Sequence, residues 1–306
     1  MTTAISVAEG NVATGRPLQL LRRYPLTSFF VMAYAISWTY VIVFLVVWPL
    51  PDTIVTDTPE LLGPVVAGFV MTAVMAGKAG VRQLLRRFVL WRVGAVWYLV
   101  ALVGVPLLYV LSIAMVPGSL ASFRAPTLTM TLLYPVFFLV VMVLDGPLLE
   151  EPGWRGFALP RLQERWGPLA GTMLLGFLWG TWHAPQYLTP TFSAANGGLS
   201  VSGVLVFLVA AVAFSVIITW AFNHTRASLL IAILLHTAIN FTQALTSDLF
   251  PAAAYNEVVP VTVFGAAAIV IIIATRGHLG YVRSTVGTGE NRLMPADVDG
   301  NRDRRP

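Results

Sequence analysis

Apolar runs of about twenty residues recur along most of this 306-residue chain. A run of that length crosses the ~30 Å hydrocarbon core of a bilayer as one α-helix. No water is available there for backbone polar groups, so an isolated spanning segment has to be helical. The chain is 57% hydrophobic and 11% charged, which is far from the composition of a water-soluble domain. We therefore predict an all-α, polytopic integral membrane helix bundle.

About eight segments are predicted to span the membrane, and the charges of their loops predict the orientation. The spans cover approximately residues 27–48, 61–77, 94–116, 128–149, 168–188, 201–222, 227–247 and 258–275. Lys and Arg accumulate in cytoplasmic loops. With both termini in the cytoplasm, eighteen of the nineteen basic residues lie on the cytoplasmic side, and only Arg124 does not. This asymmetry explains the net charge of +5 without a nucleic-acid partner.

Three regions follow from this pattern. Residues 1–24 form a cytoplasmic N-terminal tail, residues 25–275 the transmembrane bundle, and residues 276–306 a polar cytoplasmic tail that we expect to be disordered. Residues 78–92 alternate basic and apolar side chains, which fits either a helix in the inner membrane interface or a basic loop. The chain has no cysteine, which excludes disulfides, thiolate metal sites and cysteine-protease chemistry.

Charged side chains lie at the end of the fourth apolar run, where they are costly unless paired or functional. Glu150 and Glu151 are adjacent there, and Arg155 follows Glu151 by four residues. That spacing puts Arg155 and Glu151 one helical turn apart, so we expect them to pair and to leave Glu150 for other interactions. Length alone does not decide whether Glu150 lies deep in the bundle or near its inner surface.

Two further spans carry histidine. Trp179 and His183 are four residues apart in the fifth span, and His236 and Asn240 are four apart in the seventh, so each pair shares a helix face. The fourth and fifth spans are joined by a polar hairpin near Trp166, and Glu150 and His183 lie at nearly equal distances from it. In an antiparallel pair they would face each other, and we expect a site approached from the cytoplasmic side.

These three motifs together resemble the CPBP family of intramembrane endopeptidases, which includes type II CAAX prenyl endopeptidases and bacteriocin-processing Abi proteins. The resemblance covers about residues 128–247 and is carried by Glu150, Glu151, Arg155, Trp179, His183, His236 and Asn240. It implies a bacterial plasma-membrane enzyme that acts on a peptide or membrane protein, lipidated in one branch of the family. It further implies that Glu150 and His183 activate water, while His236 and Asn240 stabilise an oxyanion.

The residues themselves permit more than one chemistry. A buried glutamate can act as general base toward water, which fits a protease without a cofactor, the mechanism we favour. Glu150, His183 and His236 are also a possible zinc ligand set, although the HExxH motif of many zinc proteases is absent. A proton-coupled transporter would place the same groups inside a bundle. A structural or immunity protein with an inactive site is a further alternative.

Overall fold

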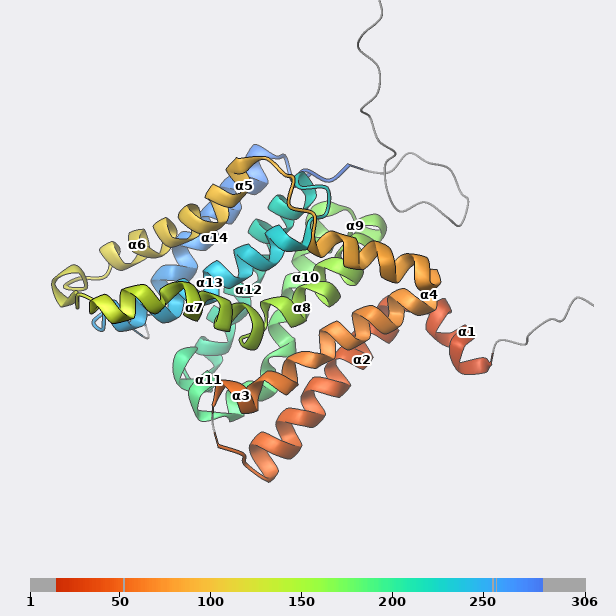
Figure 1. Ribbon diagram of the computed structural model, residues 1–306, viewed down its shortest axis with the longest axis horizontal. Coiled ribbons are helices and arrows are strands. Elements are labelled where there is room, and N and C mark those ends of the chain that lie inside the picture. Colours follow the sequence, from red (N-terminus) through yellow and green to blue (C-terminus); the bar gives the residue numbers. More distant parts are fainter. Residues whose placement is uncertain (1–14, 52, 255, 257, 283–306) are drawn as a thin grey trace, which may run out of the picture.

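The computed structural model describes residues 15–51, 53–254, 256 and 258–282, and these ranges contain helices and no strand (Figure 1). In chain order the α-helices are α1 (Arg16–Arg23), α2 (Pro25–Tyr40), α3 (Ile54–Asp57), α4 (Leu62–Phe88), α5 (Ala95–Leu99), α6 (Val105–Met115), α7 (Leu128–Leu144), α8 (Pro147–Gly153), α9 (Leu159–Trp166), α10 (Pro168–Trp182), α11 (Pro190–Ala195), α12 (Val201–His224), α13 (Leu229–Leu249) and α14 (Val258–Ala274). Short π-helical or 3₁₀ turns cover Val41–Val47, Thr58–Leu61, Val100–Gly104, Leu120–Ser122, Trp154–Ala158 and Ala184–Leu188.

The helices confirm the predicted class, an all-α polytopic membrane bundle. In the described part of the chain, 6 helical stretches are long and apolar enough to cross a membrane. They are Pro25–Val47, Ile54–Phe88, Ala95–Met115, Leu128–Trp166, Val201–His224 and Leu229–Leu249. The last predicted span corresponds to the shorter α14, and the predicted span 168–188 is α10 followed by a 3₁₀ turn. All eight predicted segments are therefore largely helical, but their lengths are unequal.

The second span and the basic segment after it form one helix, α4, with a break at Gly77. Gly77 has φ +59°, a left-handed conformation that glycine adopts at little cost. Helical structure continues from Lys78 to Phe88, and residues 89–93 are irregular. The helix interpretation of residues 78–92 is thus correct for the part that ends at Phe88.

The fourth apolar run is not one straight helix. α7 ends before Asp145, Gly146 takes φ +104°, and α8 restarts at Pro147, where a proline suits the first turn of a helix. α8 then passes into the π-helical turn Trp154–Ala158 and on into α9, which ends at the predicted hairpin near Trp166. The Glu-Glu motif therefore lies on a short helix of its own rather than at the end of a long span.

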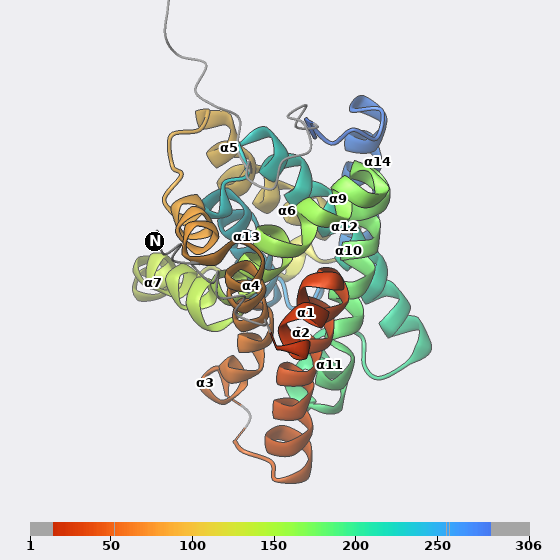
Figure 2. The same ribbon diagram turned by 90° about the vertical axis from the view of Figure 1, so that its right-hand side faces the viewer.

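Helix α13 occupies a central position in the bundle. It packs against α6, α7, α8 and α12, while α12 packs against α10 and α14 (Figures 1 and 2). α2 lies along α4, and α4 in turn packs against α8. The serine N-caps of α12 and α13 accept hydrogen bonds from backbone N–H groups one turn later, Ser200 from Gly203 and Ser228 from Ile231. Capping fixes where the two central helices begin.

The ends of the chain are only partly described. Within the predicted N-terminal tail, residues 16–23 form α1, and residues 1–14 lie outside the described ranges. At the other end Leu279 is fully buried, and its carbonyl accepts a hydrogen bond from Asn223 Nδ2 at 2.9 Å. The tail predicted to be disordered thus begins with a packed turn, and its residues 283–306 lie outside the described part.

Candidate functional site

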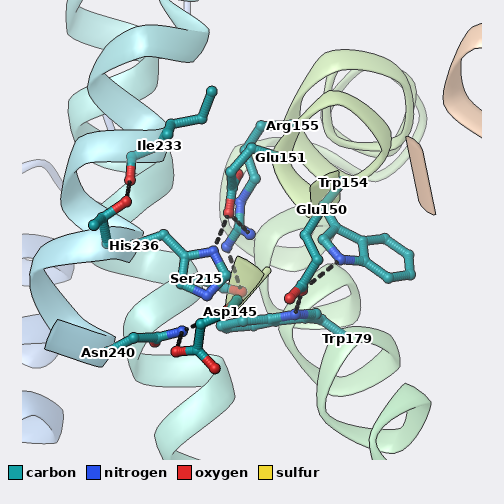
Figure 3. A network of polar contacts seen from close by, with 11 residues as sticks. Asp145, Glu150, Glu151, Trp154, Arg155, Trp179, Ser215, Ile233, His236 and Asn240 are labelled. Atoms are coloured by element: carbon teal, nitrogen blue, oxygen red, sulfur yellow. Dashed lines mark hydrogen bonds and ion pairs between the residues drawn. The ribbon is translucent and has the colours of Figure 1, made fainter. Parts of the chain in front are cut away.

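The Glu151 carboxylate is buried at the contact between α8 and α13. Its Oε1 accepts from Arg155 Nη1 at 2.8 Å and from His236 Nδ1 at 2.8 Å (Figure 3). Glu151 and Arg155 are both fully buried. The predicted i,i+4 ion pair is therefore present, and the structure adds His236 as a second partner that the sequence did not predict.

Arg155 connects this ion pair to two other helices. Its Nη2 donates to Ser215 Oγ on α12 at 3.1 Å. Its guanidinium carbon lies 5.1 Å from the centre of the Trp179 ring on α10, within the range of a cation–π interaction. A guanidinium offers five donors in a fixed plane, which suits it to hold several helices at once. Arg155 thus joins α8, α10 and α12 around one carboxylate.

Glu150 points to the other side of α8, toward α10. Its Oε2 accepts from the indole nitrogens of Trp179 at 2.6 Å and Trp154 at 3.1 Å (Figure 3). Its Oε1 approaches Gly146, where an added Cβ would lie 2.2 Å from that oxygen. Gly146 therefore serves twice, because its positive φ starts α8 and its missing side chain makes room for Glu150. Glu150, the carboxylate that takes no part in the ion pair, is therefore held by two tryptophans.

The two motif histidines both pack against the ring of Trp179. The ring centres of His236 and His183 are 5.1 and 5.6 Å from that of Trp179. His183, at the C-terminal end of α10, makes a 2.8 Å hydrogen bond through Nδ1 with the Trp179 carbonyl. We expected His183 to face Glu150 directly. The structure instead places Trp179, one turn earlier on α10, against the carboxylate.

Asn240 pairs with Asp145, the residue at the end of α7. Its Nδ2 donates to Asp145 Oδ2 and to the Asp145 carbonyl, both at 3.1 Å (Figure 3). The sequence offered no partner for Asp145, and this contact supplies one. It also ties the break between α7 and α8 to α13, so the amide of Asn240 is engaged in this state.

Four of the six predicted site residues line one cavity of about 740 Å³. They are Glu150, His183, His236 and Asn240, and Trp179 lines the same cavity. Glu151 and Arg155 do not line it and lie behind the others. The structure therefore brings all six predicted site residues into one region, with four at the cavity and two supporting them.

Three residues that contact this site, Trp154, Asp145 and Ser215, were not among those predicted. Trp154 is four residues after Glu150, so the same helical spacing that predicted the Arg155 pair would have indicated it. Asp145 is a charged residue within the fourth apolar run, but its partner depends on how α7 and α13 pack. Ser215 lies in α12, and no sequence signal distinguishes it from the other small residues there.

A zinc ion does not fit the donors as they are arranged. Within the described residues, no group of three or more His, Asp or Glu side chains converges in a way that would hold a metal. Glu150 Oε2 already accepts from two indole N–H groups, and His183 and His236 each pack against the ring of Trp179. The ligand set Glu150, His183 and His236 is therefore not assembled here.

Fold and site together define a polytopic membrane protein with buried glutamate and histidine side chains and an asparagine beside one cavity. The family model for type II CAAX prenyl endopeptidases, described as Rce1-like, matches residues 131–242. CAAX prenyl protease 2 of Methanococcus maripaludis is 32% identical over 118 residues, which are 37% of this chain and 42% of that protein. The chain thus matches less than half the length of that relative. The family resemblance indicated by the three motifs is confirmed over this region.

The ion pair gives a prediction about stability. Arg155→Leu leaves Glu151 buried without its main counter-charge, and we expect it to lower the free energy of unfolding by about 3–5 kcal/mol. Arg155→Leu combined with Glu151→Leu removes both charges and should recover part of that loss, although His236 then loses its partner. Thermal unfolding of the purified variants in one detergent measures both effects. Equal stability of the single and double variants would show that the pair does not form.

Proposed function

We propose that this protein is an intramembrane endopeptidase in which Glu150 activates a water molecule. The observation that carries the proposal is that two adjacent carboxylates have different surroundings. Glu151 is committed to Arg155 and His236, whereas Glu150 lines the cavity and contacts two tryptophans. A carboxylate at the wall of a cavity can remove a proton from water as it attacks a carbonyl carbon. The matched family, type II CAAX prenyl endopeptidases, supports peptide-bond hydrolysis as the reaction.

Trp179 and Trp154 position the proposed base. Each directs an indole N–H at Glu150 Oε2, so that the carboxylate is held in one orientation while Oε1 remains at the Gly146 side. A fixed orientation lowers the cost of bringing the base to its water. His183 borders the same cavity and, in the role the family resemblance implies, shares that water with Glu150.

His236 and Asn240 are the proposed oxyanion donors, and their contacts refine how they act. An ionised carboxylate only accepts hydrogen bonds, so His236 directs a protonated Nδ1 at Glu151. In the neutral ring Nε2 is then an acceptor, and donation from Nε2 requires the doubly protonated ring. Asn240 donates to Asp145 in this state, so substrate has to compete for its amide. Both donors are thus proposed to act once substrate is bound.

The remaining expectations belong to the same proposal. We place the enzyme in a bacterial plasma membrane, as the family resemblance implies, and both termini in the cytoplasm on the basis of the loop charges. Its substrate is a peptide or a membrane protein, and lipidated substrates fit the name of the matched relative, CAAX prenyl protease 2. We propose that no cofactor is required, because no three His, Asp or Glu side chains of the described residues converge in a way that would hold a metal.

The role of Glu150 is tested by Glu150→Gln, which keeps size but removes the proton acceptor. We expect the fold to survive and turnover to fall by at least about 10²–10⁴-fold. Terminal proteomics of membranes that carry wild type or the variant identifies peptides whose new ends disappear. Glu164→Gln, the same exchange at an exposed position of α9, is the matched control and should leave those ends unchanged. Unchanged termini in Glu150→Gln would refute the proposed base, and altered transport in place of altered cleavage would favour a transporter.

Metal dependence is a separate test. We expect the purified protein to cleave equally well with and without a strong chelator and to contain no stoichiometric zinc. Metal analysis and cleavage are measured on the same sample before and after chelation. One zinc per chain, lost together with activity and restored by re-addition, would establish the zinc mechanism instead.

A further inference from the structure

The walls of the cavity show which end of the bundle it belongs to. On α13 the lining residues run from His236 to Asp248, and none comes from the first turns of this helix, which begins at Leu229. On the antiparallel α12 they lie between Val206 and Phe214, in the half nearer its start at Val201. Both patterns place the cavity in the half of the bundle that contains the end of α13 and the start of α12.

The mouth of the cavity is formed by three connections at that same end. They contribute, among others, Thr53 from the segment before α4, Thr191 around α11 and Asn256 after α13, beside the exposed Asp248 in the last turn of α13. α3 and α11, which belong to two of these connections, lie in the lower part of Figures 1 and 2. The deepest polar residues, Glu150 and His236, are reached from these loops.

The loops after α4, α12 and α14, which contain Arg92, Arg226 and Arg276, lie at the opposite end and contribute no residue to the cavity. They contact one another, since Arg226 Nη2 donates to the Arg92 carbonyl at 2.6 Å and Ser228 Oγ to the Leu90 carbonyl at 2.8 Å. The ends of α4, α12 and α14 that carry these loops lie in the upper part of Figures 1 and 2. Basic loops mark the cytoplasmic face of a membrane protein. The cavity mouth therefore lies at the other face.

We propose that the site is entered from the membrane face opposite the basic loops, so that its substrate is a peptide segment exposed on the non-cytoplasmic side. That the entering molecule is a substrate rests on the proposed function. The route of entry depends only on the position of the cavity and on the loop charges. It replaces the cytoplasmic approach expected from the sequence. That expectation counted residues from the hairpin near Trp166, which estimates the depth of Glu150 but not the end of the bundle at which the cavity opens.

The charge of the cavity narrows the kind of segment that fits. Among the described lining residues there are the carboxylates Asp57, Glu60, Asp145, Glu150 and Asp248, and no Lys or Arg. Asp57 and Asp248 lie toward the mouth, where an entering peptide passes first. A cavity lined by one sign of charge concentrates ligands of the opposite sign. The site thus favours neutral or basic segments over acidic ones.

Cysteine accessibility tests the route without a known substrate, because the native chain contains no cysteine. Ala244→Cys places one thiol on the cavity wall, and Ala79→Cys places one in the basic segment of α4 as the control. A cationic and an anionic methanethiosulfonate reagent, both membrane-impermeant, are applied to right-side-out and inverted vesicles. We expect Ala244→Cys to react only in right-side-out vesicles, and faster with the cation by on the order of tenfold. Ala79→Cys should react only in inverted vesicles.

Two further variants keep the test decisive. Ala195→Cys, also at the cavity, replaces Ala244→Cys if that variant fails to fold. Asp57→Asn with Asp248→Asn should reduce the preference for the cationic reagent while leaving the side of access unchanged. Reaction of both cavity thiols only in inverted vesicles would overturn the proposed route, and a faster anionic reagent would overturn the charge selection. Neither result depends on cleavage, so a failure here is distinct from a failure of the peptidase proposal.

Discussion

A carboxylate removed from water inside an apolar bundle is the constraint around which this structure is built. Glu151 is fully buried, and a charge in that position is tolerated only with partners of good geometry. Arg155 comes from the adjoining turn and His236 from α13, so the ion pair also fixes how α8 meets the central helix. Arg155 then reaches Ser215 and Trp179, which extends the same constraint to α12 and α10.

The breaks in the helices explain how a neighbouring carboxylate is exposed to a cavity while Glu151 is not. A continuous helix from Leu128 onward would carry Glu150 past the end of an already sufficient span. The turn at Gly146 instead starts a new helix, α8. The π-helical turn after Gly153 widens the helix where the side chain of Trp154 points to Glu150 and that of Arg155 points to Glu151. Irregular backbone of this kind at membrane depth is tolerated where protein buries it or a cavity borders it.

The sequence predicted those features that depend on local spacing. The pairing of Glu151 with Arg155, the hairpin near Trp166 and the all-helical membrane class follow from periodicity and hydrophobic length alone. The partners of His236 and Asn240 were not predictable, because they depend on the rotation of α13 against α8 and α7. Counting residues from the hairpin assumes one straight helix, and the π-helical turn between Glu150 and Trp166 breaks that assumption. Glu150 therefore meets Trp179, which is one turn nearer the hairpin than His183.

The central claim, that Glu150 acts on water and not directly on the peptide, is tested most directly by single-turnover cleavage in ¹⁸O-labelled water. With enzyme in excess over a cleaved peptide, a general base predicts one labelled oxygen in the new carboxyl end and none in Glu150. A covalent mechanism, in which water attacks the Glu150 carbonyl of an acyl–glutamate anhydride, passes an oxygen of Glu150 to the product and takes the label into the Glu150 side chain. Mass spectrometry of the product and of the peptide that contains Glu150 reads both positions. Label in Glu150 with an unlabelled product would contradict the account.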